Sequence, residues 1–517
     1  MARLYYSLIA ACILFSSCVG NPRAQEEAEL SAFGSYVYRL DTLKMLENTK
    51  ELIASDTSRW KADRVVAENY KKLDMKQSSP LWFNRMGVSE QADSLVSFLR
   101  RELPLNGLDS TAFFLPQISA DLRIVHELSF DSLSIDINKL LSRLDYFLTK
   151  AYVRYVAGQR YGFMRPGKIF NNLELKPDLD KKPSQQKAKE YQRLFDYECA
   201  EPDYAEAYGM LSSDKRFDFL LSSAPSTPVY KAFYSQMETC TDAEERQTLA
   251  VNMERCRWKM KSPVQNEKCV IVNIPAQQLW AVCADSVLNM RICCGATNHK
   301  TPLLCSEFKY MQVNPDWIVP KNIIKTDFLR HAGDTAYFIR NQYYIVDRNS
   351  GDTLSPALVT AEEMVEPYIR IGQKSGEGNS LGRIVFRFDN DFGVYLHDTN
   401  NRKAFTRDRR TLSHGCVRVQ KPFELACFMM SDADDWTLDR LRLSIDIAPE
   451  TERGAKYLKE HQDDERPLRL LTYREISPRI PLCIIYYTAY PNPETGKVEL
   501  WPDLYGYDKV IKALLPM

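Results

Sequence analysis

The chain has no excess of either charge and no long apolar run near its N-terminus. Its 68 Lys and Arg residues are matched by 68 Asp and Glu residues, so no basic field is available to attract a nucleic acid, and we predict no nucleic-acid partner. The N-terminal apolar run, Leu4–Phe15, is too short to span a bilayer. Internal repeats, low-complexity segments and a glycine-rich phosphate loop of the Walker type are also lacking, which argues against repeat and P-loop folds.

Histidine is scarce, with 6 residues, whereas cysteine is not, with 13. The cysteines are scattered, unlike the framework of a small disulfide-rich module. Adjacent Cys293 and Cys294 would face opposite sides of a strand, so no bridge between them is expected. We predict mostly buried thiols and leave one structural pair open. His397, His414 and Cys416 could be imagined as zinc ligands, but no second cysteine or carboxylate stands at ligand spacing, so we predict no metal site.

The first residues have the three parts of a secretory signal. Arg3 precedes the apolar run, and Ser16 and Ser17 precede Cys18. Small residues directly before a cysteine suggest a lipobox, so residues 1–18 are predicted to be a lipoprotein signal peptide, with Cys18 lipidated and the chain anchored to a membrane. The alternative is a plain cleavable signal with an incidental cysteine. Either reading predicts export.

The patterning along the chain predicts an α+β protein. A chain of 517 residues exceeds one hydrophobic core, so two or three domains are expected. From Leu43 to Phe163, and again to Met260, apolar residues recur at helical spacing, which predicts a helical domain over 27–265. After Lys268 the period changes to two, which predicts an antiparallel meander, and a hairpin is expected from Leu482–Thr488 and Val498–Trp501.

One motif indicates chemistry. Tyr395-Leu396-His397-Asp398 is followed by Ser413-His414-Gly415-Cys416-Val417-Arg418, with 15 residues between His397 and Ser413. Attack on an acyl carbon needs a thiolate, a base and oxyanion donors. A free cysteine has a pKa near 8.5, so a neighbour must activate it. Cys416 is the predicted nucleophile, His397 the base, and the amides of Gly415 and Cys416 the donors.

The residues around this pair have further predicted roles. On a strand, Tyr395 and His397 share one face, which should line a groove, and Tyr395 would add a third oxyanion donor. His414 would contact substrate or support the oxyanion site, or else be a structural histidine, and both options stay open. Arg418 would bind a carboxylate bidentately, against the alternative of a surface ion pair. Ser413 is assigned to substrate binding with them.

This pattern resembles the L,D-transpeptidases with a YkuD-type catalytic domain, whose signature is a histidine, about 15 residues, then Ser or Thr, His, Gly and Cys. Three further segments match: Val272–Trp280, Asn314–Pro320 and Gly376–Gly382. Together with Asn252–Trp258 they most resemble the large periplasmic subgroup that carries a helical scaffold. The resemblance implies a mostly-β catalytic domain over 266–517, with a capping insertion at about 321–368.

A peptidoglycan-binding module sits before the Met-Glu-Arg segment in many members of the subgroup. Here only about twenty residues separate Tyr230–Tyr234 from Asn252, so we expect this module to be missing. In the family, the backbone carbonyl at the position of Asp398 orients the imidazole. Its side chain need not take part.

The resemblance implies a periplasmic enzyme that forms 3→3 cross-links between peptidoglycan stem peptides through a cysteine thioester. Such an enzyme needs no cofactor, and carbapenem-type inhibitors are expected to acylate it. An L,D-carboxypeptidase or amine-exchange variant would use the same residues. A catalytically idle wall-binding protein and a signalling or adhesion lipoprotein are the non-enzymatic alternatives.

Overall fold

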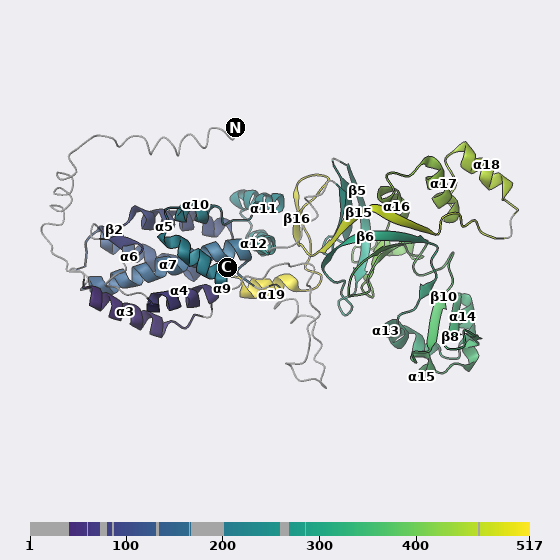
Figure 1. The fold of residues 1–517 in the computed structure, drawn as a ribbon, viewed down its shortest axis with the longest axis horizontal. Coiled ribbons are helices and arrows are strands. Elements are labelled where there is room, and N and C mark those ends of the chain that lie inside the picture. The colour runs from purple at the N-terminus through teal and green to yellow at the C-terminus, as the bar shows by residue number, and fades with distance from the viewer. Residues whose placement is uncertain are drawn as a thin grey trace. The chain divides into compact units, whose positions relative to one another are not determined.

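The computed structural model describes residues 41–58, 60–72, 80–84, 87–130, 134–164, 166, 201–258, 268–284, 286–463 and 466–517. The expected signal peptide and Cys18 lie outside these residues. The chain divides into two compact units, and Figure 1 labels their elements. The first unit comprises residues 1–104, 109–157 and 200–223, and the second comprises 105–108, 158–199 and 224–517. Within the described ranges, no helix is long and apolar enough to cross a membrane.

The first unit is helical, as the apolar spacing predicted. Its longest helix, α7, carries a row of fully or almost fully buried residues four positions apart, from Leu140 through Leu144 and Leu148 to Tyr152 and Val156. Residues four apart lie on one helix face, so this row forms the centre of the unit. Its helices are α3 (Thr42–Ser55), α4 (Lys61–Lys72), α5 (Glu90–Leu105), α6 (Leu115–His126), α7 (Ile137–Tyr161), α9 (Glu201–Gly209) and α10 (Arg216–Leu221), with a small hairpin of β1 (Phe83–Asn84) and β2 (Gly87–Val88).

Two helices open the second unit. Only residues 240–242 separate α11 (Pro228–Thr239) from α12 (Ala243–Arg257), so no peptidoglycan-binding module lies between these described helices. α12 is largely buried, and two of its polar side chains bond to residues near the C-terminus. Asn252 donates to the Thr488 hydroxyl at 2.8 Å, and Arg255 pairs with Asp508 of α19 (Tyr507–Leu514) at 2.6 Å.

The second unit is built around a nine-stranded sheet (Figure 1) with the order β13-β5-β14-β12-β11-β6-β15-β3-β4. β4 also pairs with β5, so the sheet closes on itself around an apolar core. The strands are β3 (Lys268–Asn273), β4 (Gln278–Cys283), β5 (Ser286–Gly295), β6 (Leu304–Val313), β11 (Ile384–Phe388), β12 (Leu396–His397), β13 (Thr411–Ser413), β14 (Val417–Val419) and β15 (Tyr473–Ile485).

The expected antiparallel meander is only partly correct. β3, β4 and β5 do follow one another as antiparallel neighbours, but β12 runs parallel to β14 and β15 runs parallel to β3. The predicted hairpin is also displaced. β17 (Val498–Leu500) pairs with β16 (Ala489–Pro491), because the residues up to Ile485 are already paired in the central sheet. Alternation of apolar residues identifies strands but not their partners.

A separate small sheet lies between β6 and β11 in the sequence. Its order is β7-β10-β8-β9, and it has its own core with Phe338, Ile345 and Ile371 at its centre. We call residues 317–373 the capping subdomain. Its elements are β7 (Trp317–Ile318), α13 (Lys321–Ile323), the π-helical turn η5 (Ile324–Phe328), α14 (Thr335–Arg340), β8 (Tyr343–Asp347), β9 (Thr353–Leu354), α15 (Ala361–Met364) and β10 (Ile369–Gln373).

Three helices follow the motif. α16 (Pro422–Met429) and α17 (Asp435–Ser444) bury Leu425 and Leu441 in the core of the sheet, whereas α18 (Glu452–Glu460) buries only Gly454. α18 therefore accounts for the charged run near residue 450 as a solvated helix.

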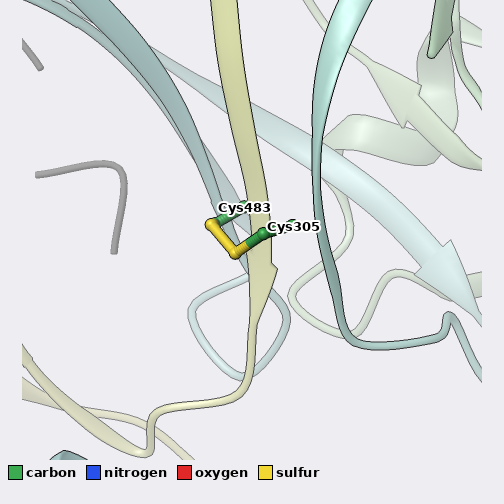
Figure 2. The surroundings of a disulfide bond; sticks show 2 residues. All are labelled: Cys305 and Cys483. Atoms are coloured by element: carbon green, nitrogen blue, oxygen red, sulfur yellow. A yellow bond between two sulfur atoms is a disulfide. The ribbon is translucent and has the colours of Figure 1, made fainter. Parts of the chain in front are cut away.

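One disulfide joins two neighbouring strands (Figure 2). Cys305 of β6 lies directly opposite Cys483 of β15, with a Cα–Cα distance of 4.3 Å. This disulfide is the structural pair that the sequence had left open. The other described cysteines are free thiols, including adjacent Cys293 and Cys294, but only three of them are fully buried, so the expected burial was partly wrong.

Candidate active site

Two short strands bring the predicted residues together. β12 and β14 are parallel, with His397 opposite Arg418, and the Val417 amide donates to the Tyr395 carbonyl at 3.1 Å. Cys416 therefore lies beside Tyr395. Paired residues share a face of the sheet, and the alternate residues of these strands point into the apolar core. The four predicted side chains thus line one outer face of the closed sheet.

The turn before Cys416 is held from inside. Gly415 has a φ of +116°, a conformation that favours glycine. The buried Thr301 hydroxyl donates to the Gly415 carbonyl and accepts from the Gly295 amide, both at 2.8 Å. The Ser413 hydroxyl donates to the Cys416 carbonyl at 2.5 Å and accepts from the Gly415 amide at 3.2 Å. The structure thus places Ser413 as a support of the turn, not on a surface open to substrate.

The Cys416 thiol is protonated at rest. Burial raises its pKa, while hydrogen bonds from the backbone and side chain of Tyr395 and the charges of Arg387 and Arg418 act in the opposite direction. Burial prevails because an anion in an apolar setting loses its hydration. A base is therefore needed during attack.

His397 is 5% exposed and uncharged at neutral pH. Burial, and after it the charge of Arg418, lowers its pKa to about 3, although backbone groups of Asp398 and Leu381 favour the protonated ring. Its Nδ1 atom has no hydrogen-bond partner in the part of the chain that the structure describes. A neutral imidazole has one unprotonated nitrogen that can accept a proton, which is what a general base requires.

The Asp398 side chain supports the neighbouring loop. Its Oδ2 accepts from the Arg383 amide at 2.8 Å, and its Oδ1 lies 3.1 Å from the Arg402 guanidinium. A Cβ atom on Gly382, whose φ is +65°, would lie 2.4 Å from the carboxyl carbon of Asp398. The carboxylate therefore fixes the loop at Gly382 and Arg383, whereas the backbone of Asp398 acts on the imidazole.

His414 points toward the capping subdomain. Its Nε2 lies 3.5 Å from the Asp327 carboxylate of η5, and its ring centroid is 5.0 Å from that of His299. Burial lowers the pKa of His414, opposed by the Asp327 charge and assisted by those of His299 and Arg418. The positive φ of Gly415 means that the segment from His414 to Cys416 is not the fully extended one that the sequence had suggested.

Tyr395 connects the thiol to residues that sequence reasoning missed. The Arg387 guanidinium lies 4.1 Å from its ring centroid, and Trp317 of the capping subdomain hydrogen-bonds its hydroxyl. Burial raises the pKa of Tyr395 well above its usual value, so the hydroxyl keeps its proton and remains a donor.

Arg418 has no counter-ion among the residues that the structure describes. Its Nε is buried without a hydrogen-bond partner, and it forms no salt bridge with a described residue. The alternative of an ordinary surface ion pair is thus not realised in this structure. Burying an unpaired guanidinium costs free energy unless a ligand anion pairs with it.

The sequence offered weak signals for the missed residues. Arg387 interrupts an alternating apolar strand at a position facing away from the core, which could have marked it. Thr301 and Asp327 gave no signal, because each reaches the motif only through the tertiary fold.

Comparison with known proteins agrees with this geometry. Residues 267–434 match the family model described as the L,D-transpeptidase catalytic domain, YkuD, and residues 66–237 match the model described as the scaffold domain. A Haemophilus influenzae protein named "Putative L,D-transpeptidase" is 29% identical over 326 residues. That alignment covers 61% of this chain and 60% of the relative.

The matched catalytic segment contains the whole motif from Tyr395 to Arg418, and the matched scaffold segment lies N-terminal to it, in the order that the sequence resemblance predicted. The chain therefore combines a YkuD L,D-transpeptidase catalytic domain with an N-terminal scaffold domain.

Proposed function

We propose that the chain transfers acyl groups between peptidoglycan stem peptides. The Cys416 sulfur attacks the carbonyl carbon of the third residue of a tetrapeptide stem, the bond to the terminal D-alanine breaks, and the stem is held as a thioester. A side-chain amine of a second stem attacks the thioester, which releases the thiol and forms a 3→3 cross-link. The position of Cys416 beside Tyr395 and diagonal to His397, within the matched catalytic domain, carries this proposal.

His397 moves the protons. The thiol and the imidazole are both uncharged at rest, so His397 accepts the thiol proton as sulfur attacks and returns it to the departing amine. In the second half-reaction the same nitrogen accepts a proton from the incoming amine and gives one to the sulfur. Each half-reaction leaves the site in its starting protonation state.

Two donors stabilise the oxyanion. The Gly415 amide is already bonded to Ser413, so the Cys416 amide serves as the backbone donor. The Tyr395 hydroxyl, which contacts the thiol and keeps its proton, is the second. Fixed donors serve both half-reactions because each passes through a tetrahedral oxyanion.

Arg418 couples substrate binding to activation. A stem carboxylate bound to its guanidinium would offset the positive charge that lowers the pKa of His397. The imidazole then becomes a stronger base only when substrate is present, which limits thiol reactivity in the free enzyme.

The proposal includes a site of action, which the sequence pattern and one structural feature support. We place the enzyme in the periplasm, anchored through lipidated Cys18, with a role in cell-wall biogenesis. The Cys305–Cys483 disulfide supports export, because disulfides persist mainly in oxidising compartments. The anchor itself rests on the sequence pattern alone.

Intact-protein mass spectrometry tests the chemistry. The chain lacking residues 1–18 would be incubated with a carbapenem or a stem tetrapeptide, beside Cys416→Ala. A covalent adduct and release of D-alanine are expected in the wild type alone. Transfer to an added amine separates transpeptidation and exchange from hydrolysis by a carboxypeptidase. A folded wild type that forms no adduct would leave the idle wall-binding protein as the better account.

A further inference from the structure

Arg387 brings a second guanidinium to the thiol. β11 pairs with β12 so that Val385 lies opposite His397, which places Arg387 opposite Tyr395 on the same outer face. Its guanidinium carbon lies 4.1 Å from the Tyr395 ring centroid. The charge of Arg387 also lowers the pKa of Cys416 and of His397, so it is close enough to act on both reacting groups.

The Arg387 guanidinium is held in place but uses only part of its hydrogen-bonding capacity. Its Nε donates to the Gln312 side chain at 3.1 Å, and the Tyr395 ring stacks against its plane. The two Nη groups have no acceptor, and the side chain has no salt bridge, among the residues that the structure describes. Half-buried arginines are usually paired, and the free Nη pair is the fork that binds a carboxylate bidentately.

Arg387 and Arg418 lie at different positions around Cys416 in the sheet. Arg418 follows Cys416 by two residues along β14, at a Cα separation of about 7 Å, whereas Arg387 lies two strands away across the sheet, at about 10 Å. Because the two side chains start from places that differ by two residues along the strand and two strands across the sheet, each guanidinium can bind a carboxylate of its own.

We propose that Arg387 binds a second carboxylate of the stem peptide, on a side of Cys416 different from that served by Arg418. This inference rests on the proposed function. Stem peptides carry a terminal carboxylate and also carboxylates on interior residues, and either kind would be bound by the same fork. Amidation of the recognised carboxylate removes its charge and should abolish the contribution of Arg387.

Binding to the chain lacking residues 1–18, in a Cys416→Ala background, tests the proposal without chemistry. Calorimetric titration would compare a stem tetrapeptide with versions amidated at the terminal or at an interior carboxylate. Arg387→Gln should weaken binding of the free-carboxylate peptide about tenfold and leave unchanged the affinity for the peptide amidated at the recognised position. Arg387→Lys should lie between. Arg474→Gln, which removes a charge from β15, separated from β11 by β6, is the control.

The recognised carboxylate is identified by the amidated peptide whose affinity is the same for Arg387→Gln and for the protein that keeps Arg387. Equal weakening for every peptide would overturn the proposal and make Arg387 a positioning residue for Tyr395. D-alanine release by the enzyme with Cys416 intact is measured in parallel. If peptide binding depends on Arg387 but no D-alanine is released, the transfer chemistry is refuted and the carboxylate site is kept. If D-alanine is released but peptide binding does not depend on Arg387, the carboxylate site is refuted and the transfer chemistry is kept.

Discussion

Replacing Arg418 with glutamine should raise the pKa of His397. The two residues are opposite one another on parallel strands, and the arginine charge is the strongest electrostatic influence on the buried imidazole. At a separation of about 6 Å and an effective dielectric constant of about 20, a unit charge contributes about 3 kcal/mol, or about 2 pKa units. The midpoint of His397 should therefore move up by about 2 units from about 3.

Carbon-13 labelling of histidine allows a direct measurement, because the chain has 6 histidines and His397→Gln identifies the signal. In the wild type the His397 ring should stay neutral between pH 5 and 8. Arg418→Gln should bring the start of its titration into the range near pH 5 to 6, and Arg418→Lys, which keeps the charge, should not. An unchanged midpoint in the glutamine variant would refute the electrostatic account of the neutral base.

Three further predictions concern the support of the site and the stability of the fold. Thr301→Val keeps the side-chain shape but leaves the Gly415 carbonyl and the Gly295 amide without their partner, so carbapenem acylation should slow about tenfold with the circular dichroism spectrum unchanged. Replacing Cys305 and Cys483 together by serine opens a link across 178 residues and should lower the unfolding free energy of the catalytic unit by about 5 kcal/mol in urea titrations, with adduct formation kept below the transition. The neutral His397 contributes stability that is complete above its unfolded pKa of about 6.5 and is lost as the pH falls toward about 3, roughly 4 kcal/mol in all, so His397→Gln should show a smaller acid loss of stability than the wild type.

Local patterns predicted the parts of the fold that depend on local geometry. The four-residue spacing along α7 follows from the helical repeat, and the change to a period of two after Lys268 follows from the strand repeat. The short distance between Tyr230 and Asn252 excluded an inserted module, and α11 and α12 are indeed joined by three residues. These features need only neighbours in the sequence.

Strand partners depended on contacts between distant segments. β15 pairs with β3 in parallel register, Leu482 opposite Val270, although more than 200 residues separate them. The expected meander and hairpin were wrong where such pairing intervened. Alternation shows that a strand has a buried face, but many strands of similar patterning could fill each place.

The sequence by itself determined the nature of this protein: a helical domain, a β domain, and a histidine and cysteine at the spacing of an acyl-transfer site. Only the tertiary structure decided how the site is completed. It placed Arg387 and Trp317 against Tyr395, Asp327 against His414, and Thr301 under the turn. The reason is that chemistry such as a thiol beside an imidazole is carried by a short motif, whereas the charge and burial that set its pKa come from residues that meet only when the sheet closes.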